Sequence, residues 1–141
     1  MRRAAMLRVF ADEQLKRIAN GSERGQHRRG SVLFEAGEPA GGATLVLFGL
    51  LDLRIAPGAP SDHVAGVGSL LDGVAMVVEA VHGLTATARV ETEVLFIPRA
   101  TVLGVLADFP EYAKPLQDEI ALRSAALIEE LAPLAASLRE P

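Results

Sequence analysis

The chain has 141 residues, a length that suits one compact domain with a core of its own. Half of the residues are hydrophobic but only 4% are aromatic, so the core must consist mainly of Val, Leu, Ile and Ala. Cysteine is absent, which excludes disulfides, thiolate metal sites and cysteine nucleophiles, and the net charge is −4.

The first thirty residues are basic although the whole chain is acidic, because they hold eight Arg or Lys side chains and three Asp or Glu. Such a segment could bind nucleic acid or an anionic surface, or it could be the solvated face of a surface helix. We favour the solvated face. The segment lacks the apolar run of a signal peptide, and no apolar stretch reaches the roughly 18 residues of a membrane span. We therefore expect a cytoplasmic protein.

The segment ADEQLKRIAN is short and amphipathic. Phe10, Leu15 and Ile18 form an apolar stripe, and two acidic residues near its start favour a helix N-terminus. The pattern predicts one short helix inside an N-terminal helical part that covers about residues 8–30.

Between residues 31 and 98 the sequence changes to short runs rich in Val, Leu, Ile and Thr. The runs are SVLFEAG, TLVLFG, LLDLRIA, HVAGVG, LTATARV and EVLFIP. Clusters of Gly, Pro and Asp such as AGEPAGG and APGAPSD separate them at regular spacing. This arrangement predicts an all-β barrel or sandwich over residues 31–98.

Residues 99–140 return to a helical pattern. RATVLGVLADF predicts a short helix that ends before Pro110, and a longer helical segment follows from about residue 111 to 138. Apolar residues recur in this segment at heptad-like spacing. They are Ile120, Leu127, Leu131, Leu134 and Leu138. This seam could make a homodimer, or it could fold back as a lid on the barrel. We favour the dimer, because a helix of this length offers more apolar surface than a small barrel can cover.

Three segments together resemble the cyclic nucleotide-binding domain family, which includes catabolite activator proteins, kinase regulatory subunits and gated channels. They are RRGSVLFEAGEPAGGATLVLFGLLDLR, TATARV and VLFIPR. Gly30, Gly37 and Gly49 fall where that family turns its strands, and tight turns need the positive φ that glycine adopts without strain. The resemblance implies a single domain over residues 1–141. Its fold would be mainly β with flanking helices: a double-stranded β-helix, or β-roll, followed by C-terminal helices.

The resemblance also implies a ligand site. In the family, a phosphate-binding cassette opens with a glycine-glutamate pair and a short helix, and ends with an arginine before a Ser/Thr-Ala-Thr-Ala strand. Here the glutamate position falls on Gly73 and the arginine position on Leu84, directly before TATA. The cassette residues of this chain would be Leu71, Asp72, Gly73, Val74, Ala75, His82, Leu84, Thr85 and Ala86.

The two charged anchors of the cassette are therefore replaced by uncharged residues. A cyclic phosphate needs a guanidinium to offset its charge, and a carboxylate accepts the ribose hydroxyl hydrogen bond. Each such charge-assisted bond contributes roughly 1.5–3 kcal/mol, so losing both weakens binding by about a hundredfold or more. Ordinary binding of cyclic AMP or cyclic GMP is not expected. A cyclic nucleotide bound in another way, or another small anionic ligand, stays open.

Other polar residues of the cassette have two interpretations each. His82 could supply a weak positive charge, or it could be an exposed loop histidine, which is the commoner case. Asp72 and Glu79 could meet a sugar hydroxyl, or they could be a solvated helix cap and face, which we favour. Thr85 and Thr87 could hydrogen-bond a ligand, although threonine is also good strand material.

Catalysis and metal binding have no support in the sequence. His27, His63 and His82 are far apart in the chain and lack the paired spacing of a metal site. No Ser-His-Asp spacing, P-loop or GxGxxG pattern occurs. We expect no enzymatic activity.

Two functions from different classes remain. The first is a regulatory sensor for a small ligand, in which binding at residues 71–88 shifts the helices that follow Arg99. The second is a ligand-free module that docks a protein partner in signalling. A pocket sealed by Leu84, Val77 and Val78 would favour the second, and an open cavity the first. Because the sequence ends at Pro141, where transcription factors of the family continue into a helix-turn-helix domain, we expect no direct DNA binding.

Overall fold

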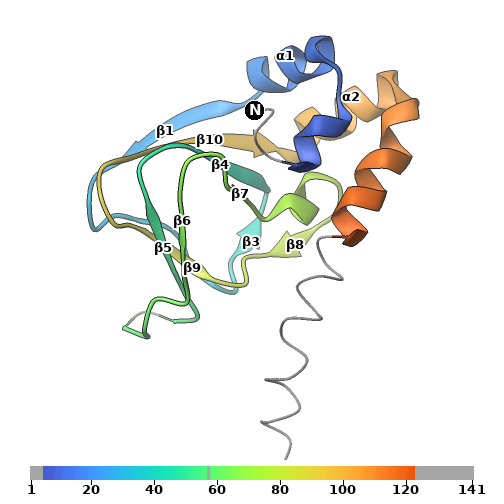
Figure 1. The fold of residues 1–141 in the computed structure, drawn as a ribbon. Helices are drawn as coiled ribbons and strands as arrows, with labels where there is room; N and C mark the ends of the chain where they lie inside the picture. The colour runs from blue at the N-terminus through green and yellow to red at the C-terminus, as the bar shows by residue number, and fades with distance from the viewer. Residues whose placement is uncertain (1–4, 57, 123–141) are drawn as a thin grey trace, which may run out of the picture.

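The computed structural model describes residues 5–56 and 58–122. Within these residues, ten short strands form the body of the fold, and helices cover one end of it (Figure 1). The N-terminal helices are η1 (Ala5–Val9) and α1 (Asp12–Asn20). The strands are β1 (Glu23–His27), β2 (Val32–Phe34), β3 (Pro39–Ala40), β4 (Gly42–Phe48), β5 (Leu51–Arg54), β6 (His63–Ala65), β7 (Leu70–Leu71), β8 (Ala80–Val81), β9 (Thr85–Ala88) and β10 (Thr92–Pro98). The remaining helices are η2 (Gly73–Met76), α2 (Arg99–Asp108), η3 (Pro110–Tyr112) and a helix over residues 113–122.

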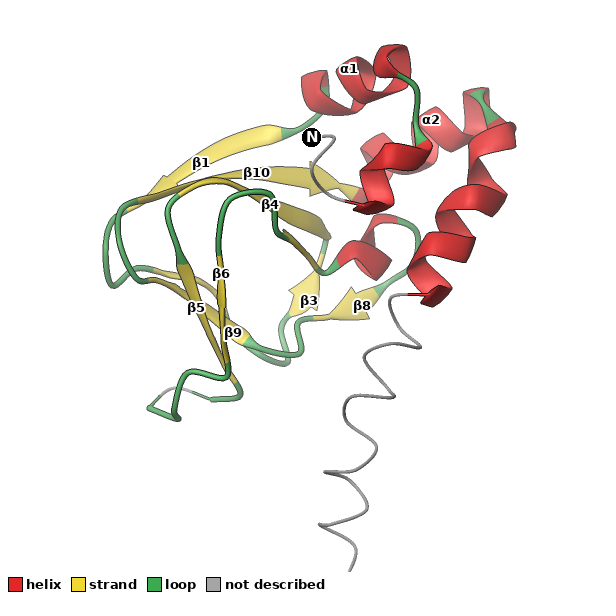
Figure 2. Cartoon of the chain, viewed as in Figure 1, coloured by secondary structure: helices red, strands yellow, loops and turns green. Residues whose placement is uncertain are grey.

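The strands form two antiparallel sheets that face each other, and a third pair lies at the end nearest the helices (Figure 2). The first sheet has the order β1-β10-β4-β7, the second has the order β2-β9-β5-β6, and the third pairs β3 with β8. This is the mainly β fold with flanking helices that the sequence predicts.

Strands β4 and β10 separate two apolar cores, because alternate residues of a strand point to opposite faces of its sheet. One face packs with the second sheet. This core between the sheets consists of Val46, Leu51, Leu53, Ala65, Ala86, Ala88 and Val94. The opposite face packs against the helices. That second core includes Leu45, Leu95 and Ile97 from the strands, together with Leu7, Phe10, Leu15, Ile18, Val102, Val105 and Leu116.

Both short helices agree with the prediction. The stripe formed by Phe10, Leu15 and Ile18 is buried, so α1 packs its apolar side on the sheet. Helix α2 ends at Asp108, two residues before Pro110. The turn glycines Gly30, Gly37 and Gly49 have φ angles of 88°, 90° and 94°.

The predicted helical part at residues 8–30 is wrong over its last third, where β1 runs from Glu23 to His27. This strand pairs with β10 at the edge of the first sheet, and its residues are mostly exposed. An edge strand of this kind is held by backbone hydrogen bonds and needs no apolar alternation. Its polar sequence therefore carries no periodic signal.

The C-terminal seam is only partly within the described residues. Ile120 is 9% exposed and belongs to the core between the sheet and the helices. At this position the helix packs on its own domain and offers nothing to a second copy. Leu127, Leu131, Leu134 and Leu138 lie outside the described residues.

In the part of the chain that the structure describes, none of the helices combines the length and the apolarity needed to cross a bilayer.

Candidate ligand-binding site

The cassette opens at Asp72, whose backbone is left-handed with φ 60° and ψ 41°. Among the described residues, Asp72 is the only one other than glycine with a positive φ. Aspartate adopts this conformation more readily than most residues. Asp72 directly precedes Gly73, the position at which the resemblance places the glutamate of the glycine-glutamate pair. The short helix η2 follows directly at Gly73.

The two positions expected to carry charge are both apolar and packed. Gly73 is buried, and a Cβ there would collide with the thioether end of Met6. Leu84 is half-buried and packs against the core between the sheets, as does Leu71 at the start of the cassette. Ala75 is fully buried, whereas Val74 is 39% exposed.

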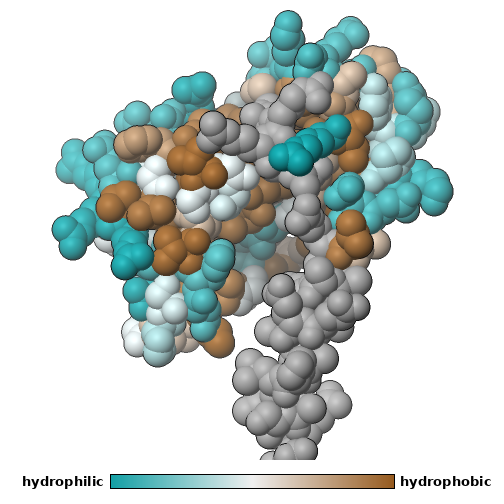
Figure 3. Space-filling model, in the orientation of Figure 1, coloured by the Kyte–Doolittle hydropathy of each residue, from teal (hydrophilic) through white to brown (hydrophobic). Residues whose placement is uncertain are grey.

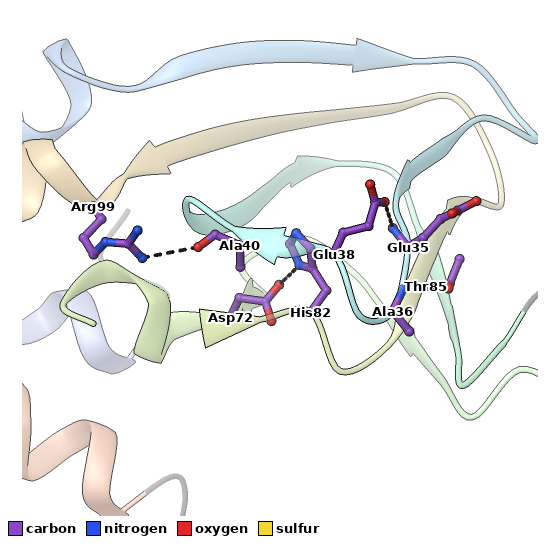
Figure 4. Close-up of polar contacts among 8 residues, drawn as sticks. All are labelled: Glu35, Ala36, Glu38, Ala40, Asp72, His82, Thr85 and Arg99. Carbon is purple, nitrogen blue, oxygen red and sulfur yellow. Dashed lines mark hydrogen bonds and ion pairs between the residues drawn. The ribbon is translucent and has the colours of Figure 1, made fainter. Parts of the chain in front are cut away.

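His82 is buried, at 9% exposure, and this overturns the expectation of an exposed loop histidine. Its Nδ1 lies 2.7 Å from Oδ2 of Asp72, and its ring stacks on Phe34 with centroids 3.8 Å apart (Figure 4). Asp72 makes no side-chain cap to η2, so the predicted solvated cap is also wrong. Glu79 is exposed, in agreement with a solvated face.

The backbone of His82 is fixed as well as its ring. Its N–H donates to the carbonyl of Glu38 at 2.9 Å, and its carbonyl accepts from the N–H of Gly37 at 2.7 Å. Because backbone, ring face and Nδ1 are all engaged, the imidazole is held in one orientation. No sequence pattern predicts this arrangement, since its contacts come from two other segments, residues 34–38 and Asp72.

Thr85 uses its hydroxyl within the protein. The oxygen accepts a hydrogen bond from the N–H of Ala36 at 3.0 Å and so fixes the turn between β2 and β3 (Figure 4). Glu38 supports the same turn, because its carboxylate accepts from the N–H of Glu35 at 2.8 Å. Ala86 is fully buried in the core between the sheets and pairs in register with Phe34 and Leu53.

Arg99, the first residue of α2, contacts the cassette directly. Its Nη1 lies 3.3 Å from the carbonyl oxygen of Ala75 and 2.9 Å from that of Val78. The same nitrogen lies 3.3 Å from the carbonyl oxygen of Ala40 in β3 (Figure 4). The guanidinium therefore joins the end of η2, strand β3 and the start of α2.

A cavity of about 300 Å³ lies beside His82. Its wall includes His27, Phe34, Thr44, Val94 and Phe96. Leu84, Val77 and Val78 do not line it. Val77 packs into the core beneath the helices, and Val78 is 52% exposed. The cavity brings together two histidines that are 55 positions apart in the sequence, His27 and His82, while His63 in β6 is elsewhere.

Across residues 5–56 and 58–122, no cluster of three or more His, Asp or Glu side chains could hold a metal ion.

Three valines are exposed on the outer surface of the cassette, together with Glu79. Val78 and Val81 are 52% and 61% exposed, and Val74 adds to them. On the face shown in Figure 3, hydrophobic side chains are scattered over the strands, whereas the outer surface of the helices is largely hydrophilic.

Several solved structures have the same architecture as this chain. The N-terminal domain of a transcriptional regulator from Streptomyces coelicolor A3(2) has a TM-score of 0.77 at 24% identity, over 91% of this chain and 94% of that one. A cyclic nucleotide-binding-like protein from Brucella abortus has a TM-score of 0.69 at 29% identity, over 75% of this chain and 93% of that one. The sensor domain of the transcriptional regulator DNR from Pseudomonas aeruginosa has a TM-score of 0.72 at 20% identity, over 92% and 89%. The sequence matches no protein-family model and no curated protein.

Proposed function

We propose that this chain, which has the fold of the cyclic nucleotide-binding domains, is a cytoplasmic regulatory sensor for a small ligand other than ordinary cyclic AMP or cyclic GMP. It has no catalytic role in this proposal. Its output passes to a second copy of the chain or to another signalling protein.

The observation that carries this proposal is the packing of Leu84. This residue stands where the family places its phosphate-binding arginine, and it lies against the core between the sheets. A phosphate brought to this position would lose water and gain no cation, which is strongly unfavourable. Gly73, at the glutamate position, is buried against Met6 and offers no acceptor for a ribose hydroxyl. The turn of the cassette is retained while its charge-binding groups are lost.

The transmission of a signal is proposed to run through Arg99. A ligand that moves η2 displaces the carbonyl groups of Ala75 and Val78, to which the guanidinium donates. Arg99 is also the first residue of α2. When η2 moves, α2 must therefore move with it, or the hydrogen bonds from Arg99 to Ala75 and Val78 must break. The shift can be no larger than the difference in ligand affinity between the two helix positions.

Titration calorimetry with cyclic AMP and cyclic GMP, up to millimolar concentration, tests the ligand part of the proposal. We expect no binding in the micromolar range. Micromolar binding of either nucleotide would show that the cassette has a substitute for its missing arginine, and the proposal would have to be replaced by ordinary nucleotide sensing.

A ligand-free interaction module is the second candidate. It is supported by Val74, Val78 and Val81, which present an apolar surface on the outside of the cassette. Substituting Val78 and Val81 with serine should abolish partner capture in this case and leave the fold unchanged. Under the sensor proposal, the same double variant should leave ligand binding in the adjoining cavity unaltered.

A further inference from the structure

The cavity beside His82 lies within the mouth of the β-roll, between the two sheets. Thr44 and Phe96 occupy the same strand face as Val46 and Val94, which belong to the core between the sheets. Phe34 forms the opposite wall from β2 in the second sheet. The space is open to solvent on one side, and its volume of about 300 Å³ is at the lower end of small-molecule sites.

The chemistry of the wall excludes a strongly charged occupant. Apart from the two imidazoles, the wall has no titratable side chain among the described residues, and most of it is aliphatic or aromatic. An ammonium group buried here would lose its water and find no carboxylate on the wall, and a phosphate would find only the two imidazoles, one of which already contacts the Asp72 carboxylate. A flat apolar molecule would instead contact Phe34, Val94 and Phe96.

Nε2 of His82 is one polar atom of this wall that a ligand could hydrogen-bond. No fully buried side-chain nitrogen or oxygen of the described residues lacks a hydrogen-bond partner, and the His82 ring makes its hydrogen bond through Nδ1. Nε2 is therefore within reach of solvent, and it lies on the side of the ring away from Asp72 (Figure 4). A carboxylate only accepts hydrogen bonds, so Nδ1 carries the hydrogen of this contact, and in the tautomer with its hydrogen on Nδ1, Nε2 is an acceptor.

We propose that this cavity binds a neutral, flat aromatic molecule that donates one N–H or O–H hydrogen bond to Nε2 of His82. The inference rests on the proposed sensor function, since it names the ligand class of that sensor. It also gives the ligand a route to the cassette, because the opposite nitrogen of the same ring holds Asp72, the residue that opens η2.

The test uses indole and 1-methylindole, which share the ring system but differ in the N–H donor. Each is titrated into the full ¹⁵N-labelled chain and followed by two-dimensional NMR. Indole is expected to shift the amide signals of Thr44 and Phe96 saturably, with submillimolar affinity. The N-methyl compound should bind about three- to tenfold more weakly, the loss typical of one neutral hydrogen bond. Indole-3-carboxylate should also bind more weakly than indole.

Three variants localise the binding. His82→Phe keeps an aromatic ring against Phe34 but removes Nε2, so the preference for indole over 1-methylindole should vanish. His63→Phe, at an exposed histidine in β6, is the matched control and should change nothing. Gly41→Leu fills the cavity from its rim without touching His82. A Cβ there meets only Phe96, at an ordinary 3.6 Å, so this variant should fold and lose indole binding.

Each contrary result overturns the inference. Absence of saturable binding at millimolar indole would refute the site, and so would shifts confined to the exposed valines of η2 and β8, or unchanged affinity in Gly41→Leu. The sensor function is judged separately, by hydrogen exchange in α2. Indole binding without any change there would confirm the site and refute the coupling.

Discussion

Nη1 of Arg99 lies 2.9 Å from the carbonyl oxygen of Val78, and this contact joins the first residue of α2 to the end of the cassette. Both elements belong to the part of the fold that would have to move in a sensor. The strength of the junction can be measured without knowing any ligand.

Replacing Arg99 with methionine removes the hydrogen bonds to the carbonyls of Ala40, Ala75 and Val78 but keeps much of the apolar stem. We expect the free energy of unfolding in urea to fall by about 1–3 kcal/mol. Amide exchange in η2 should also become faster. Arg89→Met, at an exposed arginine that follows β9, is the control and should change stability by less than about 0.5 kcal/mol. Equal effects of the two substitutions would contradict the proposed junction.

Leu84→Arg tests whether the cassette lacks only its cation. One charge-assisted hydrogen bond contributes roughly 1.5–3 kcal/mol, so cyclic AMP affinity should rise by about ten- to a hundredfold. Leu84→Met is the control, since it keeps an apolar side chain of similar volume and should leave the affinity at the wild-type level. Calorimetry on both variants gives the comparison. If Leu84→Arg is folded and also fails to bind, the cassette lacks more than its cation and is closed to cyclic nucleotides.

Gly73 and Met6 form a second testable pair. A methyl group at Gly73 would collide with the end of the Met6 side chain, so Gly73→Ala should cost about 1–3 kcal/mol by overpacking. Met6→Ala alone opens space at the same place. The double variant should therefore be more stable than the sum of the two single effects predicts, by at least about 0.5 kcal/mol in urea unfolding. Strict additivity would show that the methionine moves aside freely.

The predicted dimer rests on residues outside the described part of the chain, and it stays a prediction. If the seam joins two copies, Leu127→Asp with Leu131→Asp should convert a dimer into a monomer in light scattering. Leu103→Asp, on an exposed position of α2, should leave the mass unchanged. A wild-type protein that is monomeric at high concentration would contradict the predicted dimer without any variant.

The fold could be predicted from the sequence wherever one face of an element is buried, because burial there makes apolar residues recur at regular spacing. The runs that became β4, β5, β9 and β10 are apolar because they face a core, and α1 shows its stripe for the same reason. Strands β3, β7 and β8 have two residues each, which is too short for any period to appear.

The candidate site was only partly predictable. The order of residues along the chain was enough to assign Gly73 to the glutamate position and Leu84 to the arginine position of the family's cassette. The burial of His82 was not predictable, because it depends on Asp72 and on the segment that holds Phe34 and Glu38, which come together only in the fold. The cavity was missed for the same reason, since its wall is assembled from strands β1, β2, β4 and β10, none of which carries a motif for it.

The polar sequence of β1 has a consequence for how copies of the protein meet. This strand forms the outer edge of its sheet, where unpaired N–H and C=O groups can recruit a strand from another chain. Glu23, Arg24 and Gln26 are exposed along it, and Arg24 forms an ion pair with Glu93 across the ladder. A foreign apolar strand would have to desolvate these groups in order to pair. The polar residues that leave β1 without an apolar pattern therefore also disfavour aggregation through this sheet edge.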